Sequence, residues 1–229
     1  MALEPETGLF TVVALRRRDG GDNHEAAVAD DLLADEEQAL TVWGDAAHGT
    51  GESRARLAAA GHTTIVKPPP LRPAVPGGFT LDDFRIVLAA GVVTCPAGHT
   101  VPLTAPSGPH QQRCAYYNQL CVGCPLRGRC TTGRAGRIVT IRPHHDAQAA
   151  ARRQAATDPA WQDEFRRWRP LVERGIAWLT HRSRRLRYRG VFKNDAWLHH
   201  RAAARNLRRL VNLGLDITNG TWTINATNP

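Results

Sequence analysis

The chain has 229 residues and carries 30 Lys and Arg against 21 Asp and Glu, which gives a net charge of +9 at pH 7. No apolar run approaches the roughly 18 residues that a membrane-spanning helix needs. The first residues also lack the basic and apolar regions of a secretory signal. The composition therefore excludes a membrane-spanning protein and predicts a cytoplasmic one with one or two folded domains.

The charge is unevenly distributed along the chain. Residues 1–60 hold twelve acidic and five basic residues, whereas residues 151–210 hold sixteen basic and five acidic residues. A local excess of positive charge on this scale indicates a polyanionic partner, and nucleic acid is the commonest one. The sequence therefore predicts that the C-terminal part of the chain binds DNA or RNA.

The first 67 residues alternate between short apolar runs and amphipathic segments. We expect strands at Leu9–Leu15, Leu40–Gly44 and Thr63–Val66, separated by helices at Ala26–Leu33 and Glu52–Ala60. Such alternation with short connections predicts an α/β layered domain in which the later strands run parallel. Asp45 directly follows the second strand, at the edge where parallel sheets bind ligands. Its carboxylate could bind a ligand there or cap the turn that follows.

Residues 68–145 are rich in Pro and Gly, and we expect only short elements, such as a helix or strand between Phe79 and Leu88. Cysteines follow the spacing Cys114-x6-Cys121-x2-Cys124-x5-Cys130, and Cys95-x3-His99 offers two more ligands. Four thiolates suit a structural Zn²⁺ or, as an alternative, an iron–sulfur cluster. Reduced, buried thiols without metal are the remaining alternative. A bound metal would stabilise this segment, which has too little apolar content to fold alone.

The chain becomes helical from Ala147. We expect a helix at Ala149–Ala156 capped by Asp146, and a second helix that begins at Pro159 and bends or breaks at Pro170. The buried face of the second helix is predicted to comprise Trp161, Phe165, Trp168, Val172, Ile176 and Leu179. A last helix is expected at Trp197–Leu215, and no firm structure is expected at 216–229.

Glu173 is an acid within a strongly basic region, at the border of that predicted face. It could pair with Arg169 or Arg174 on the helix surface. It could also join Asp45, because two carboxylates from distant segments suit Mg²⁺, a hard cation with oxygen ligands. Metal-assisted cleavage of a phosphodiester normally uses a third carboxylate, with nearby arginines holding the nucleic-acid backbone.

Nine short segments between about residues 3 and 215 are more specific in combination than any one of them is alone. They are Glu6–Thr11, Trp43–Gly49, Ile65–Pro68, Phe79–Phe84, Cys95–His99, Cys121–Cys130, Arg169–Arg174, Arg187–Gly190 and Asn206–Leu210. In this order they resemble the C-terminal part of the catalytic domain of DDE transposases from bacterial insertion sequences. More narrowly, they resemble the group with a Cys-containing insertion before the catalytic Glu.

The resemblance implies a ribonuclease H-like domain that cuts DNA at element ends and joins them to a target with Mg²⁺. Asp45 would be the second catalytic acid and Glu173 the third, both as Mg²⁺ ligands. In the related pattern Tyr-x2-Arg-x3-Glu-x6-Lys, Arg169 and Glu173 match, whereas Arg166 and Thr180 replace the Tyr and the Lys. The residues expected to contact DNA are Arg169, Arg174, Arg184, Arg185, Arg187, Tyr188 and Arg189.

The resemblance also implies that the first catalytic Asp and the first two strands of the fold are missing from this chain. We therefore expect a partial core at 1–67, an insertion with the cysteine cluster at 68–145, a basic helical part at 146–215 and a polar tail at 216–229. Unpaired strand edges would cause low stability, self-association or association with an N-terminal fragment. The expected function is that of a truncated transposase with little activity alone, acting at the nucleoid. The alternatives are a non-enzymatic DNA-binding or repressor remnant and an inactive pseudogene product.

Overall fold

The computed structural model describes the chain except for residues 18, 21–22, 24, 181–184 and 225–229. The chain forms two compact units. Unit 1 comprises Met1–Gly49, Arg56–Lys67 and Gln154–Pro229, and unit 2 comprises Thr50–Ala55 and Pro68–Arg153. No helix among the described residues has the length and apolar character needed to cross a membrane.

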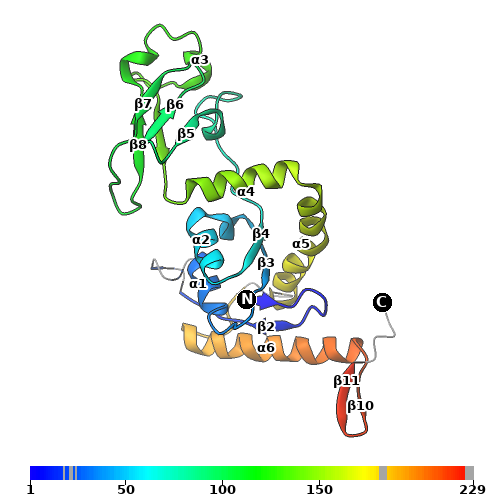
Figure 1. Ribbon diagram of the computed structural model, residues 1–229. Helices are drawn as coiled ribbons and strands as arrows, with labels where there is room; N and C mark the ends of the chain where they lie inside the picture. Colours follow the sequence, from blue (N-terminus) through cyan, green and yellow to red (C-terminus); the bar gives the residue numbers. More distant parts are fainter. Residues whose placement is uncertain (18, 21–22, 24, 181–184, 225–229) are drawn as a thin grey trace. The chain divides into compact units, whose positions relative to one another are not determined.

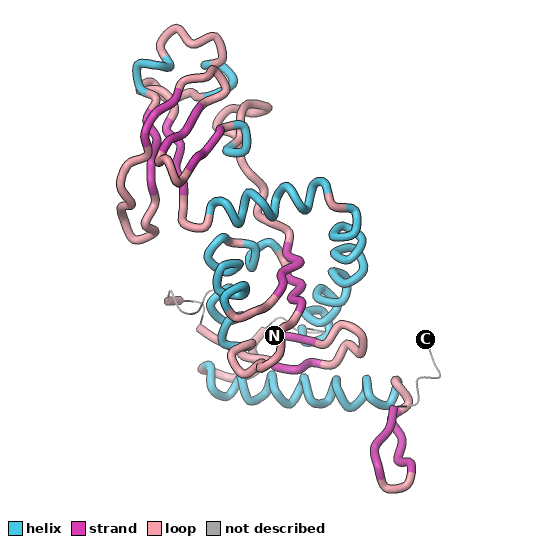
Figure 2. Tube along the Cα trace, viewed as in Figure 1, coloured by secondary structure: helices cyan, strands magenta, loops and turns pink. Residues whose placement is uncertain are grey.

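Unit 1 is a mixed α/β structure (Figures 1 and 2). Its strands are β1 (Ala2–Leu3), β2 (Phe10–Val12), β3 (Thr41–Gly44), β4 (Thr63–Val66), β10 (Leu215–Thr218) and β11 (Thr221–Ile224). Its helices are α1 (Glu25–Leu32), the 3₁₀ helix η2 (Ala46–Gly49), α5 (Pro159–Thr180) and α6 (Val191–Asn212). Two further helices, α2 (Gly51–Ala59) and α4 (His145–Thr157), belong partly to unit 1 and partly to unit 2. The α/β class is confirmed, and the ribonuclease H-like arrangement stays a prediction.

Strands β3 and β4 pair in parallel, with Thr41 opposite Thr63 and Gly44 opposite Val66. This pairing confirms the expectation of parallel strands in this part of the chain. Helix α5 packs on the pair, and the rings of Trp43 and Trp168 meet with their centroids 5.9 Å apart. The contact fixes the end of β3 against the middle of α5.

Helix α5 differs from expectation in two respects. It continues through Pro170 without a break, although proline removes one helical hydrogen bond. Ile176 is 52% exposed, so its predicted place on the buried face is wrong, and Gly175 is buried instead. A Cβ at Gly175 would lie 2.6 Å from Leu3 Cδ2, so the N-terminal strand approaches the helix backbone here. Burial on both sides of Pro170 holds the helix together.

Helix α6 supplies hydrogen bonds that a neighbouring strand would otherwise make to β2. Asn206 Oδ1 accepts the Phe10 N–H at 2.8 Å, and Asn206 Nδ2 donates to the Phe10 carbonyl at 2.8 Å. Asp195 Oδ1 accepts the Leu15 N–H at 2.6 Å. The expectation that this segment keeps unpaired backbone groups is therefore wrong for Phe10 and for the Leu15 N–H. Figure 1 shows α6 running alongside β2.

Residues 215–224, most of the expected polar tail, form an antiparallel hairpin of β10 and β11 that pairs Thr218 with Thr221. The expectation of no firm structure is wrong for these residues. Asn219 (φ 52°) and Gly220 (φ 77°) make the turn, and positive φ at both central residues is what a two-residue hairpin turn requires. The remaining tail residues, 225–229, lie outside the described residues.

Unit 2 contains a three-stranded antiparallel sheet of β5 (Arg85–Val87), β6 (Val92–Thr94) and β7 (Thr100–Pro102). A second antiparallel pair is formed by β8 (Arg113–Tyr116) and β9 (Ile138–Ile141). The short helical turns are η3 (Leu81–Asp83), η4 (Asn118–Cys121) and α3 (Arg127–Cys130). The core centres on Tyr117, which is 2% exposed and donates its hydroxyl hydrogen to the Val93 carbonyl at 2.9 Å.

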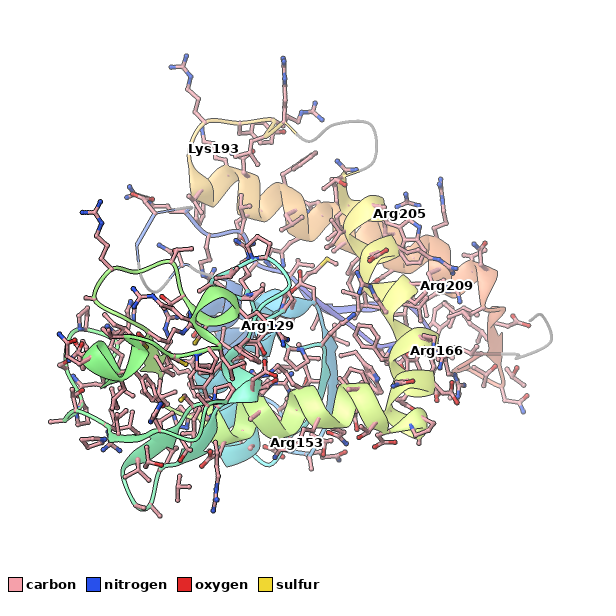
Figure 3. All side chains as sticks on the ribbon, turned by 90° about the horizontal axis from the view of Figure 1, so that it is seen from above. Arg129, Arg153, Arg166, Lys193, Arg205 and Arg209 are labelled. Atoms are coloured by element: carbon pink, nitrogen blue, oxygen red, sulfur yellow. The ribbon has the colours of Figure 1, made fainter. Side chains whose placement is uncertain are left out.

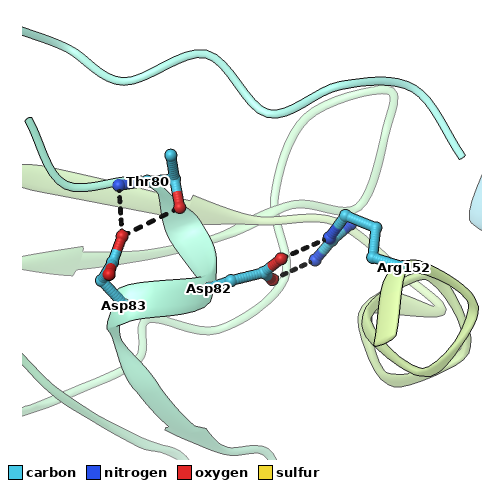
Figure 4. Close-up of polar contacts among 4 residues, drawn as sticks. All are labelled: Thr80, Asp82, Asp83 and Arg152. Carbon is cyan, nitrogen blue, oxygen red and sulfur yellow. Dashed lines mark hydrogen bonds and ion pairs between the residues drawn. The ribbon is translucent and has the colours of Figure 1, made fainter. Parts of the chain in front are cut away.

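The part of α4 that belongs to unit 2 is tied to η3 (Figure 4). Arg152 binds both carboxylate oxygens of Asp82, at 2.7 and 2.5 Å. Asp83 accepts the backbone N–H of Thr80 at 2.7 Å and closes the η3 turn. Asp146 lies inside the first turn of α4, because the helix begins at His145, so the expected N-cap is wrong.

Replacing Asn206 with Ala should lower the free energy of unfolding by about 2–4 kcal/mol, because the Phe10 N–H and carbonyl are both left without a partner near the core. Urea unfolding followed by circular dichroism measures the change. Asn212→Ala is the matched control, because Asn212 is an exposed residue at the end of the same helix. Equal stability of the two variants would contradict the bridging role of Asn206.

Candidate functional site

Asp45 lies directly after β3, in the position expected from the sequence. Its Oδ1 accepts the Ala47 N–H at 2.9 Å and is 3.8 Å from His48 Nε2. The side chain is 62% exposed. The carboxylate therefore caps the η2 turn while remaining accessible to solvent.

Glu173 lies on α5 and projects from the helix surface. Its Oε1 accepts a hydrogen bond from Arg169 Nε at 3.1 Å, and its side chain is 65% exposed. This pair is one of the two partners considered from the sequence. An exposed pair four residues apart on a helix contributes little to stability, so the Glu173 carboxylate can exchange Arg169 for another cation at small cost.

The two acids belong to the same unit, and the contact between Trp43 and Trp168 joins the segments that carry them. Their exposed oxygens are donors of the type that Mg²⁺ prefers. Within the described part of the chain, no group of three or more His, Cys, Asp or Glu side chains is arranged to hold a metal ion. Each carboxylate is thus of a donor type that fits Mg²⁺, and among the described residues neither belongs to a group of three such side chains.

A cavity of about 440 Å³ lies in unit 1 beside α5. Its lining includes Glu6, Arg167, Trp168, Arg174, Trp178 and Arg209. Arg167 stacks over the Trp168 ring at 4.5 Å, and Arg209 Nε donates to the Thr7 carbonyl at 2.6 Å. Three guanidinium groups around one cavity favour an anionic ligand such as a phosphate group.

The wall of this cavity is shaped by a turn around Glu4. Its carboxylate accepts backbone hydrogen bonds from Glu6 at 2.9 Å and Thr7 at 2.6 Å, and it also bonds to the Thr7 hydroxyl. Burial alone would raise the pKa of Glu4, but these hydrogen bonds outweigh burial and lower its pKa. Glu4 therefore stays ionised, and the turn that presents Glu6 and Gly8 to the cavity is fixed.

The residues expected to contact DNA fall into two groups. Arg169 and Arg174 are exposed on α5, and Figure 3 labels further basic side chains of unit 1, namely Arg166, Lys193, Arg205 and Arg209. The other group occupies the segment before α6, where Arg185, Arg187, Tyr188 and Arg189 are exposed. Arg184 lies outside the described residues.

The segment before α6 is held by a residue that the sequence pattern does not single out. Asn194 is 1% exposed, accepts the Tyr188 N–H at 2.9 Å and donates to the carbonyls of Tyr188 and Gly190 at 2.6 Å. Arg187 lies over the Tyr188 ring at 5.7 Å. The signal in the sequence is an amide four residues after Gly190, which can fold back onto the chain where the helix begins.

The cysteines all lie in unit 2 as free thiols. Cys95, Cys121, Cys124 and Cys130 line one small cavity together with the exposed His99, whereas Cys114 is not part of its lining. The set brought together therefore differs from the expected Cys114, Cys121, Cys124 and Cys130.

Comparison with models of protein families matches residues 94–211 to the transposase DDE domain. The match covers just over half of the chain, and the chain therefore belongs to this family. Glu173 and the five cysteines lie within the matched residues, whereas Asp45 lies outside them. Comparisons with curated proteins and with solved structures found no match. The resemblance to DDE transposases is confirmed, and the narrower group stays a prediction.

Replacing Glu173 with Gln should change the free energy of unfolding by less than about 0.5 kcal/mol, because the variant removes only an exposed helix-surface ion pair. Thermal or urea unfolding measures the change. A decrease of several kcal/mol would mean that Glu173 has a structural role that its exposure does not indicate.

Proposed function

We propose that the chain acts in DNA transposition, binding DNA through the basic surface of unit 1 and contributing Asp45 and Glu173 as Mg²⁺ ligands for phosphoryl transfer. The strongest support for this proposal comes from the position of Glu173. Glu173 is an exposed carboxylate on an arginine-rich helix, inside the residues that match the transposase DDE domain. A carboxylate placed among cations that favour DNA phosphates is suited to recruit a metal to the same phosphate.

Each group has a distinct role in this proposal. Arg167, Arg174 and Arg209 neutralise the DNA backbone, which positions a phosphodiester close to α5. Asp45 and Glu173 would hold Mg²⁺, and Glu173 would give up Arg169 to do so. The metal would activate the attacking oxygen and stabilise the leaving one.

The second candidate function is DNA binding without chemistry, as in a repressor. It is favoured by the absence, among the described residues, of a third acid grouped with Asp45 and Glu173. Both functions use the same basic surface. They differ only in whether DNA is cut.

Changing Arg167 and Arg174 together to Ala should weaken binding to duplex DNA, because two cations are removed from one cavity. We expect the slope of log affinity against log salt to become shallower by about 0.9 for each DNA phosphate that the protein no longer neutralises. Fluorescence anisotropy over a salt series measures both quantities. Arg72→Ala is the control, because Arg72 is an exposed arginine of unit 2. An equal decrease in affinity in both proteins would contradict the proposed DNA surface.

Asp45→Asn and Glu173→Gln should each reduce Mg²⁺-dependent nicking of element-end DNA by about a hundredfold or more, while DNA binding persists. Gel analysis of nicked product measures the rate. Asp163→Asn is the matched control, because Asp163 is an exposed acid on α5 that pairs with Arg166 at 2.9 Å. Nicking that survives both changes would overturn the metal-ligand roles, and DNA binding without nicking by the unaltered chain would favour the second function.

A further inference from the structure

Unit 2 contains a small cavity whose wall is rich in sulfur. Four cysteines line it, namely Cys95, Cys121, Cys124 and Cys130, and Tyr117 and Phe79 close its apolar side. Cys121 and Cys130 are each 8% exposed, and Cys95 packs against the same core. The cavity holds about 20 Å³, which is enough for a single water-sized occupant.

Three local structures bring the four thiols together. Cys95 opens the turn between β6 and β7, where its N–H donates to the His99 carbonyl at 2.9 Å and its carbonyl accepts from Gly98. Cys121 ends η4, and Gly123, with φ 71°, turns the chain back to present Cys124. Cys130 is the last residue of α3. The chain thus supplies ligands from a hairpin turn, a Cys-x2-Cys turn and a helix end.

Cys114 is excluded from this set by strand alternation. It lies in β8, where Ala115 is fully buried in the core and successive side chains point to opposite faces. Cys114 Sγ instead lies 3.8 Å from the Thr140 hydroxyl, its cross-strand neighbour. The sequence spacing groups Cys114 with the other three, but the strand turns it away from them.

Two arginines make the cavity electropositive. Arg127 and Arg137 both line it, and they donate to the carbonyls of Cys121 and Cys130 at 3.1 and 3.3 Å. The backbone N–H of Arg137 donates to Cys121 Sγ at 3.4 Å. Arg137 Nε is buried without an acceptor in the part of the chain that the structure describes. A thiolate in the cavity would supply one, and a tetrathiolate bound to a divalent cation carries the two negative charges that two guanidinium groups balance.

We propose that Cys95, Cys121, Cys124 and Cys130 bind one structural Zn²⁺ in unit 2, with Cys114 and His99 outside the ligand set. Four thiolates are a complete tetrahedral shell for zinc, so no position remains open for chemistry. The proposal is independent of the proposed role in transposition.

The four thiols face one cavity, and among the described residues no group of three or more His, Cys, Asp or Glu is yet arranged to hold a metal ion. The metal would join three loop segments of a unit whose strands are only three or four residues long.

The experiment measures metal content and thiol reactivity on the full chain purified from zinc-containing medium. We expect about one zinc per chain by mass spectrometry. In the native protein a thiol reagent should modify Cys114 alone, and the remaining four thiols should react only after a chelator is added. This measurement uses the unaltered protein, so it does not depend on whether a variant folds.

Two variants then identify the ligands. Cys95→Ser should lose most of the bound zinc, whereas Cys114→Ser, the matched control, should keep it. A Co²⁺-substituted protein should show the strong thiolate charge-transfer absorption of a tetrahedral site, and Cys114→Ser should leave that spectrum unchanged. Retention of zinc by Cys95→Ser, loss of zinc by Cys114→Ser, a brown iron-containing protein, or a folded chain with five reactive thiols and no metal would each overturn the proposal.

Discussion

The pair of hydrogen bonds between Asn206 and Phe10 is the interaction on which unit 1 depends. It joins residues 196 positions apart and satisfies both backbone groups of a strand residue that is 6% exposed. A strand edge without such partners would be costly to bury. With Asn206 in place, α6 covers β2, and Phe10, Val13, Leu179 and Ala202 form one core cluster. The glycine at 175 completes the arrangement, because it lets β1 approach α5 closely.

Elements with a strong local pattern can be predicted from the sequence. The apolar runs at β3 and β4 and the helix between them indicate their positions and their parallel pairing. The hairpin of β10 and β11 also has a local signal that the prediction passed over, because apolar and polar residues alternate in both strands and Asn219-Gly220 is a strong turn signal. The role of Asn206 cannot be predicted, because a side chain that bonds to the backbone of a residue 196 positions away leaves no periodic trace in the sequence. Pro170 predicts a bend or a break in α5, and the break does not occur, because tertiary packing outweighs the missing hydrogen bond.

The residues of the candidate sites also differ in whether the local sequence is enough to predict them. Asp45 and Glu173 can be proposed as site residues from their residue types and surroundings, and the structure places both carboxylates at the surface of one unit, Asp45 beside His48 and Glu173 beside Arg169. Of the two, only Glu173 lies within the residues that match the transposase DDE domain. For the cysteines, spacing alone favours Cys114 because it is nearer in sequence than Cys95. In the structure the turn after β6 places Cys95 at the cavity, whereas strand alternation in β8 directs Cys114 away from it. The spacing of the cysteines shows neither effect.

The bridge from Asn206 to Phe10 also sets an order of events during synthesis. Strand β2 leaves the ribosome before α6, because the Asn206 that satisfies the Phe10 backbone is made nearly two hundred residues later. Most of unit 2 is one continuous segment, Pro68–Arg153, and its contacts can form as soon as that segment emerges. Contacts between residues so distant in sequence close slowly. The nascent chain must therefore hold β2 without α6 while unit 2 folds, and during that interval the edge of β2 that α6 later covers is most exposed to wrong pairing.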